Sequence, residues 1–525
     1  MPGTCGAGMV LRHYTVHAHH NIVSAGNRST YGCGMSDLFA RKPLSQLLET
    51  SERDHALKRV LGPLNLIALG VGAVIGAGIF VITGSAAAQY AGPAITLSFV
   101  LAGAGCAFAG LCYAELASMI PIAGSAYTYA YASLGELIAW VIGWDLVLEY
   151  AFSAATVASG WSANAVSLLQ DFGIAIPGGF AATPAERGIF NVPAFLIVCL
   201  VTIILVVGIR ESANLNVIVV FIKVGTVITF LMVATAFLLK NPDVARRNWS
   251  PFIPPNAGRF GEYGWSGIAR GAATIFFAYI GFDAVSTAAQ ESRDPQRDMP
   301  VGILGSLALC TILYLVVAAA LTGVVHYSKL NVAAPVAVAI DAAGVTWGSL
   351  LVKSGTLAGL STVMLTTLLG QSRIFFVMAK DGLLPRWVGA IHPRFRTPWM
   401  SSIVVGLAIA TVAGLLPIST LGNLVSIGTL LAFIIVCLGV WILRRIRPDM
   451  ERPFRTPLVP AVPILGIGIS LLLMASLPID TWIRLVVWLV IGLVIYFGYG
   501  RHHSVLRGSR MPSGDSFSVG STGTP

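Results

Sequence analysis

Two glycines, Gly76 and Gly78, interrupt the apolar stretch LNLIALGVGAVIGAGIFVITG. Each costs a continuous helix about 0.8–1 kcal/mol relative to alanine, so the pair favours local unwinding. Unwound backbone at membrane depth is tolerated only where protein or a water-filled cavity satisfies its N–H and C=O groups. The freed N–H groups of Ala77 and Gly78 suit a carboxylate. The freed carbonyls of Val74 and Ile75 suit a cation, so one unwound turn could bind both ends of a zwitterion.

The same glycines have a second interpretation. Glycine is frequent in transmembrane helices, where small residues often mark close packing between helices and nothing more. A dinucleotide-binding loop is disfavoured, because GVGAVIG does not match the GxGxxG fingerprint and no strand precedes it.

Charged residues inside other apolar stretches include Lys223, Asp145 and Glu149. Lys223, in NVIVVFIKVGTVITF, would cost about 2.5–3.5 kcal/mol if unpaired at the centre of a membrane helix. Burial disfavours its charged form, so the amine could release its proton during a functional cycle. Asp145 and Glu149 are four residues apart and share one helix face. They could attract a cation, take part in proton movement, or hydrogen-bond within a bundle.

Composition identifies the kind of protein that holds these residues. The chain has 525 residues, of which 56% are hydrophobic and 11% charged, and its mean hydropathy is +0.80. A polytopic membrane protein in a lipid bilayer is predicted, since soluble proteins are about a quarter charged. The net charge of +10 lies in short connectors between apolar segments, so no nucleic-acid partner is expected. No metal site, ATP-binding motif or other cofactor site is recognisable, and no enzyme constellation is visible.

Twelve apolar segments of bilayer length follow the basic N-terminal region. Their approximate limits are 64–84, 93–119, 135–169, 191–209, 213–239, 268–290, 302–326, 349–379, 399–416, 421–443, 458–476 and 481–499. An even number of spans places both termini on one side of the membrane. Lys and Arg concentrate in the connectors of that side, which predicts that both termini are cytoplasmic. The connector 240–267 fits least well, because it would place four basic residues outside.

The remaining residues form the two tails. Residues 1–63 are predicted to be an N-terminal cytoplasmic tail, and residues 500–525 a C-terminal one. Residues 1–34 lack hydrophobic periodicity and are expected to be disordered. Met35, followed by SDLFARKPL, looks like a natural start, so the segment before it could be an upstream translation artefact.

A second interrupted segment reveals an internal symmetry. The sixth span, ARGAATIFFAYIGFDAVSTAAQ, carries Gly281 in its middle, five spans after the glycines of the first. Interrupted apolar segments at corresponding places indicate a transporter site built on inverted repeats. Spans 1–5 (64–239) and 6–10 (268–443) are therefore predicted to be two repeats of opposite topology, with spans 11 and 12 (458–499) accessory.

Several motifs together resemble the amino acid-polyamine-organocation superfamily, and within it bacterial members of the cationic amino acid transporter family. They are IGAGIF in the first span, CYAELAS at 112–118, GWDLVLEY at 143–150, FFAYIGFDAVS at 276–286, ESRDPQRDMPVGI at 291–303 and AKDGLLP at 379–385. The resemblance covers residues 35 to about 500. It implies the all-α leucine-transporter fold with discontinuous helices 1 and 6, alternating access, and amino acid uptake coupled to protons rather than sodium.

The resemblance also implies site residues. The N–H groups of Ala77 and Gly78 would bind the substrate carboxylate. Main-chain carbonyls would bind the α-amino group, namely those of Val74, Phe277, Ala278 and Ile280. These contacts recognise any α-amino acid, so selectivity must come from side chains nearby. Thr366 and Thr367 in span 8 lie where related transporters place a pocket wall, although both hydroxyls could instead bond back to their own helix.

The resemblance gives Lys223 a role as well. In relatives, a lysine at this place puts its amine where sodium-coupled members of the fold bind sodium, between spans 1, 5 and 8. Lys223 is therefore predicted to couple transport to protons, with Glu149 as a second participant. The alternative is a lysine that hydrogen-bonds carbonyls of the first break without titrating.

The expected function is import of L-amino acids with protons, with broad specificity in side chain, across a plasma (inner) membrane. The alternative is a selective arginine and lysine carrier, a polyamine carrier or an exchanger. A polyamine lacks the carboxylate that the first break is suited to bind. The sequence leaves open whether a small single-span accessory subunit binds.

Overall fold

The computed structural model describes residues 38–42, 61–120, 125–207, 213–332, 334–395 and 397–508. Within these ranges the regular elements are helices, and an isolated bridge pairs Leu61 with Ser292. The expectations about residues 1–34 and the start at Met35 fall outside the described residues.

Seven helical stretches of the described residues are long and apolar enough to cross a membrane. One runs from Pro63 to Met119 and contains the first interruption, and another runs from Ile479 to Arg507 and begins with α17 (Ile479–Ile495). The others are α6 (Glu136–Asp171), α8 (Ala213–Lys240), α11 (Pro295–Val324), α13 (Thr346–Lys380) and α15 (Ile418–Ile446).

Shorter helices complete the bundle. Three of them are apolar: α7 (Val192–Val207), α14 (Trp399–Leu415) and α16 (Ala461–Ser476). Connecting helices lie between the long ones: α5 (Ser125–Ser133), α9 (Pro242–Asn248) and α12 (Pro335–Ala342). Two short helices, α18 (Arg501–His503) and α19 (Val505–Gly508), follow α17. The predicted spans 191–209 and 213–239 agree with α7 and α8 within a few residues, because uninterrupted apolar runs leave little freedom in where a helix ends.

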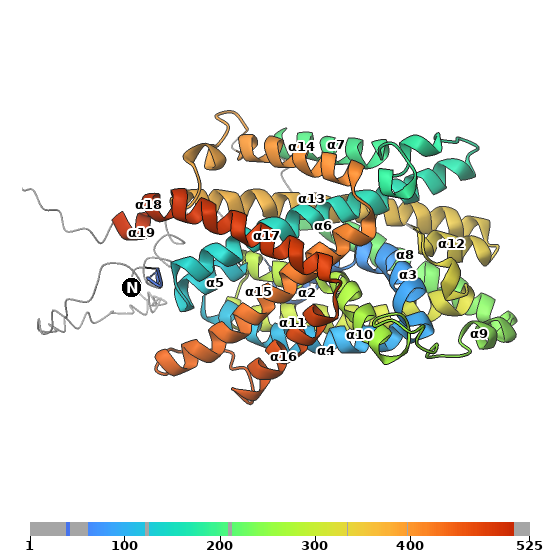
Figure 1. The fold of residues 1–525 in the computed structure, drawn as a ribbon, viewed down its shortest axis with the longest axis horizontal. Coiled ribbons are helices and arrows are strands. Elements are labelled where there is room, and N and C mark those ends of the chain that lie inside the picture. The colour runs from blue at the N-terminus through green and yellow to red at the C-terminus, as the bar shows by residue number, and fades with distance from the viewer. Residues whose placement is uncertain are drawn as a thin grey trace, which may run out of the picture.

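The long helices run side by side along the length of the molecule (Figure 1). Helix α13 packs against α6 and α8, while α11 packs against α2 and α4 (Ile95–Met119). Helices α7 and α14 pair with each other along one side of the bundle (Figure 1). Residues 38–42 lie at the same end as α19, since Lys42 N–H donates to Tyr131 O and the Arg507 side chain reaches Glu136 in the next helix.

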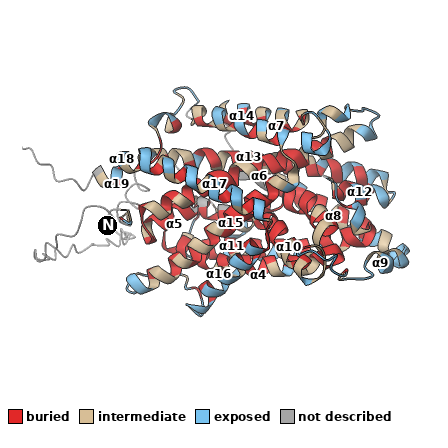
Figure 2. Cartoon of the chain, in the orientation of Figure 1, coloured by how far each residue is buried: buried red, intermediate tan, exposed pale blue. Residues whose placement is uncertain are grey.

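The buried residues concentrate in the middle of the bundle, as Figure 2 shows, and outer helices carry exposed apolar side chains. The most regular example is α17, whose exposed residues include Ile483, Val486, Val487, Val490, Ile491 and Val494, with the charged Arg484 beside them. An apolar outer face of this kind is expected where a helix contacts lipid, since water would not favour it.

Ion pairs connect the ends of several helices. Glu115 on α4 accepts from Arg444 at 2.6 and 3.1 Å and from the N–H of Thr456 at 2.8 Å. At the opposite end of the bundle, the buried Lys353 of α13 pairs with Asp171 at 2.7 Å and with Asp341 of α12 at 2.9 Å. The pairs of Glu115 with Arg444 and of Asp171 with Lys353 join elements that are far apart in sequence.

Near residues 38–42, Lys42 pairs with Asp381 at 2.8 Å, and the hydroxyl of Tyr127 donates to the same carboxylate at 2.8 Å. Burial, together with the charge of Asp381, raises the pKa of the Tyr127 hydroxyl well above its usual value. The tyrosine therefore stays a hydrogen-bond donor throughout the physiological pH range.

Candidate functional site

The first helix is interrupted where the glycines predict it. Helix α2 (Pro63–Val74) stops at Val74, and Ile75 is extended at φ −71° and ψ 100°. A π-helical turn, η1 (Gly78–Ile82), then leads into α3 (Thr83–Ala86). The C-terminal carbonyls of α2 and the first N–H groups after the interruption therefore lack the partners that a continuous helix would supply.

The second interruption follows the same plan. Helix α10 (Gly264–Ile275) gives way to a 3-10 turn, η6 (Phe276–Tyr279), and then to η7 (Asp283–Glu291). Between the last two lies Gly281 at φ +116°, a backbone conformation that glycine adopts without strain. The Asp283 carboxylate, in the first turn of η7, accepts from the Gly281 N–H at 3.3 Å.

The two interruptions touch each other through their glycines. A Cβ added to Gly78 would lie 2.2 Å from Cα of Ala278, and one added to Gly281 would lie 2.9 Å from the carbonyl of Ala73. The glycines thus serve close packing as well as unwinding, so both interpretations of the sequence apply. Because backbone meets backbone here, carbonyls of the two breaks lie close together.

Helix α2 keeps its regular bonding up to its end, where the Val71 carbonyl accepts from the N–H of Ile75 at 2.9 Å. Freed carbonyls of both breaks have a donor on a third helix. The carbonyls of Val74 and Ala278 both lie within hydrogen-bond distance of the hydroxyl of Tyr314 on α11, at 2.7 and 2.8 Å. The interruption is therefore paired to the surrounding helices, as unwound backbone in a membrane must be.

The Phe277 carbonyl, predicted to face the α-amino group, accepts from the N–H of Ile280 at 3.2 Å. Phe277 and Ala278 are buried, and Ile280 is partly exposed. The structure thus brings the predicted residues of the two breaks into one place, beside a tyrosine that the sequence analysis did not single out.

Lys223 is buried and points at the first break. Its ammonium donates to the carbonyl of Gly72 at 2.5 Å, and its aliphatic stem packs against Gly359 of α13, where a Cβ would lie 3.2 Å away. The lysine thus lies between α2, α8 and α13, the first, fifth and eighth predicted spans. A cation here also faces the C-terminal, electronegative end of α2.

Helix α13 contributes a wall beside the first break. Val363 packs against Gly76, where a Cβ would lie 3.1 Å from the valine side chain. One turn later, the hydroxyl of Thr367 donates to the carbonyl of Val363, and that of Thr366 donates to Thr362 O at 2.8 Å. Both hydroxyls bond back to their own helix, which was the alternative interpretation.

Asp145 and Glu149 are fully buried on α6 but bond to neither break. Both oxygens of Asp145 and one of Glu149 have no hydrogen-bond partner among the described residues. Asp145 lies against Gly428 of α15, where a Cβ would be 2.9 Å from the carboxylate. Since an ionised, unpaired carboxylate is very costly in such a place, these groups are suited to carry a proton.

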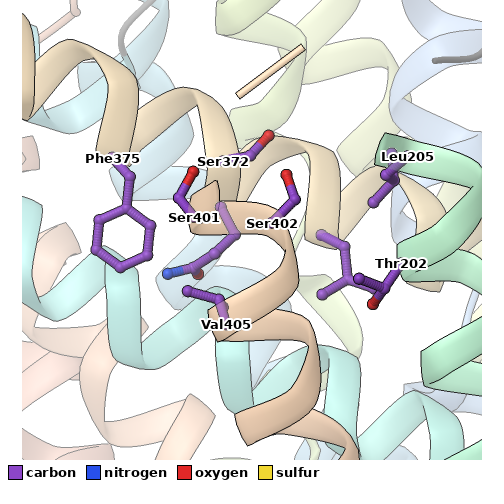
Figure 3. Close-up of a pocket in the computed structure, with 9 residues that line it drawn as sticks. Thr202, Leu205, Ser372, Phe375, Ser401, Ser402 and Val405 are labelled. Carbon is purple, nitrogen blue, oxygen red and sulfur yellow. The ribbon is translucent and has the colours of Figure 1, made fainter. Parts of the chain in front are cut away.

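A small cavity lies elsewhere, between α7, α13 and α14 (Figure 3). Its volume of about 10 Å³ is room for about one water molecule. Figure 3 shows Thr202, Ser372, Ser401 and Ser402 around it, and the buried Gln371 also lines it. It includes none of the residues predicted from the sequence, so the two breaks remain the candidate site.

Comparisons of the sequence with known proteins show its family. The model of the amino acid permease family matches residues 61–498. A methylthioribose transporter of Bacillus subtilis is 44% identical over 474 residues, covering 90% of this chain and 100% of the relative. The branched-chain amino acid permease BcaP of the same organism is 43% identical, covering 89% and 99%. The vacuolar cationic amino acid transporter 4 of Arabidopsis thaliana is 37% identical, covering 79% and 68%.

Proposed function

The chain belongs to the amino acid permease family of the amino acid-polyamine-organocation superfamily, and on this premise we propose that it imports L-amino acids together with protons by alternating access. Its relatives are named transporters and permeases, so the protein is a multi-pass membrane transporter and not an enzyme. The observation that carries the proposal is the contact between the two helix breaks at Gly78 and Ala278.

The chemistry of the breaks suits an α-amino acid. The N–H groups of Ala77 and Gly78 begin a half-helix, where partial positive charge favours a carboxylate. The carbonyls of Val74, Ala278 and Ile280 offer partial negative charge a short distance away, which favours an ammonium group. Main-chain N–H groups and carbonyls in one place support recognition of the carboxylate and ammonium groups that all α-amino acids share.

Side-chain selectivity would then depend on the wall around the breaks. Val363 on Gly76, the backbone-bonded Thr367 and the partly exposed Ile280 form a mainly apolar surface. This supports broad acceptance of neutral side chains, branched ones included, as the name of the BcaP relative also suggests. A selective arginine, lysine or polyamine carrier is the alternative, supported by the cationic transporters among the relatives.

Methylthioribose is a second candidate substrate, because a transporter named for it is 44% identical along its whole length. It is a neutral thiosugar with neither a carboxylate nor an ammonium group. Its recognition would leave the paired N–H and C=O groups of the breaks without the charges that they suit.

We further propose the membrane arrangement. Seven long apolar stretches and three shorter helices are found among the described residues. Counting the stretch Pro63–Met119 as two spans, and α10 with η7 as one broken span, supports twelve spans in a 5+5 inverted repeat (64–239 and 268–443). The shared end of residues 38–42 and α19 supports termini on one side, which the distribution of Lys and Arg makes cytoplasmic in a plasma membrane.

Proton coupling is assigned to Lys223, with Glu149 as a second group. The ammonium of Lys223 bonds to a carbonyl just before the first break, so loss of its proton would weaken that bond and free the end of α2. Glu149, buried with one unpartnered oxygen, could hold a proton on helix α6, which packs against α13. Movement of the first helix would thereby depend on protonation.

Uptake into proteoliposomes tests the proposed substrate. Labelled alanine is supplied outside, with an inward proton gradient and no sodium, and protein-free liposomes serve as the control. We expect uptake of alanine that excess leucine and other neutral amino acids inhibit. If only arginine and lysine are taken up and inhibit uptake, the cationic alternative is favoured. Uptake of methylthioribose but of no amino acid would refute the proposal.

A further inference from the structure

Tyr314 joins the two helix breaks through one atom. Its hydroxyl lies 2.7 Å from the carbonyl oxygen of Val74, the last residue of α2, and 2.8 Å from that of Ala278 in η6. The side chain is 1% exposed and comes from a third helix, α11. One hydroxyl therefore fixes the distance between main-chain groups that are far apart in sequence.

The ring of Tyr314 is held in place from behind. It packs against Phe99 and Tyr279 with ring centroids 5.4 and 5.5 Å away. The hydroxyl of Tyr279 donates to the carbonyl of Phe99 at 3.0 Å, which ties these rings to α4. The phenol of Tyr314 therefore has little freedom to move away from either carbonyl.

The hydroxyl of Tyr314 carries too few hydrogens for the carbonyls of Val74 and Ala278 that meet at it. A phenol carries one hydrogen, so it can donate to the carbonyl of Val74 or of Ala278 but not fully to both. Three oxygen atoms thus share one hydrogen in a buried place, where an unsatisfied acceptor is costly. An ammonium group brings three N–H donors and no acceptor, so it is the chemical group that this junction lacks.

We propose that Tyr314 is a positioning residue for the amino group of the substrate. Its hydroxyl holds the carbonyls of Val74 and Ala278 at the separation that lets one ammonium group bond to both. The proposal rests on the function proposed above, because it assumes a substrate with an α-amino group. It adds a side chain from α11 to a site otherwise built from main chain.

The test is Tyr314→Phe, which keeps the ring and its packing and removes only the hydroxyl. We expect the KM of alanine uptake to rise about tenfold with a smaller change in kcat, since about one buried hydrogen bond to the site is lost. Lactate, which has a hydroxyl in place of the amine, is tested as a competitor of alanine. Its inhibition constant should change little, so discrimination between amine and hydroxyl falls.

The matched control is Tyr263→Phe, which also removes a hydroxyl that donates to a main-chain carbonyl, that of Ala88 at 2.6 Å. We expect it to keep the wild-type KM. The melting temperature of each purified variant, with and without alanine, is the second measurement. Tyr314→Phe should melt near the wild type without alanine and be stabilised less by it.

Three results would overturn the inference: an unchanged KM, equal losses for alanine and lactate, or a variant that no longer folds. The last two would give the hydroxyl a general structural role. Absence of alanine uptake by the wild-type protein would instead refute the proposed function, so the two failures are distinguishable.

Discussion

Gly78 and Ala278 bring the two interrupted helices into backbone contact, with room for a hydrogen atom but not for a Cβ between them. The contact joins segments that are 200 residues apart in sequence. Close by, the carbonyls of Val74 in the first break and of Ala278 in the second meet at the hydroxyl of Tyr314.

Gly78→Ala should therefore damage both stability and transport. The new Cβ would lie 2.2 Å from Cα of Ala278, so the breaks must move apart, at a cost of about 1–3 kcal/mol or more for overpacking. We expect a lower melting temperature and a large loss of alanine uptake. Gly225→Ala on α8 is the control, because a Cβ there meets nothing within 4 Å and alanine favours the helix. Wild-type uptake by Gly78→Ala would contradict the close contact.

Lys353→Gln should loosen α12. The buried ammonium pairs with Asp341 of α12 and with Asp171 at the end of α6, and the variant leaves two carboxylates facing each other. Both carboxylates are about two-fifths exposed, so solvent screening limits the loss to about 1–1.5 kcal/mol. We expect amide exchange in residues 335–342 to become roughly tenfold faster by mass spectrometry. Exchange as slow as in the exposed control Lys329→Gln would contradict this account of the ion pairs.

Glu115→Gln should lower stability. The carboxylate is 2% exposed, and it accepts from the Arg444 guanidinium at 2.6 Å and from the N–H of Thr456 at 2.8 Å. The neutral glutamine leaves the positive charge of Arg444 with a weaker partner. Since Arg444 is only a quarter exposed, the free energy of unfolding should fall by about 2–3 kcal/mol. The melting temperature of the purified protein measures the effect. Asp243→Asn breaks a pair that is more than four-fifths exposed and should change nothing, so equal melting of the two variants would refute the prediction.

The positions of both breaks could be predicted from sequence, because glycine interrupts apolar runs there and few other residues would leave a helix unwound. Lys223 could be predicted as well, since an isolated charge in a membrane helix needs a partner. The carbonyl of Gly72 supplies that partner. These features depend on local chemistry that a single segment displays.

Tyr314 could not be predicted in the same way. It lies in the apolar run CTILYLVV, where tyrosine carries no distinctive signal. Its partners are 240 and 36 residues away in the chain, so their meeting depends on how three helices pack. For the same reason, sequence alone could not decide whether the hydroxyl of Thr367 would face a ligand or its own helix.

We propose above that the ammonium of Lys223 couples amino acid movement to protons. The most direct measurement is accumulation of labelled alanine in sodium-free proteoliposomes under an imposed gradient of one pH unit, about 1.4 kcal/mol per proton. We predict about tenfold accumulation by the wild type and by Lys240→Ala, a variant at the exposed end of the same helix, if one proton moves with each alanine. Lys223→Ala should still exchange alanine but not concentrate it. Undiminished accumulation by Lys223→Ala, or wild-type accumulation that requires sodium, would contradict the claim.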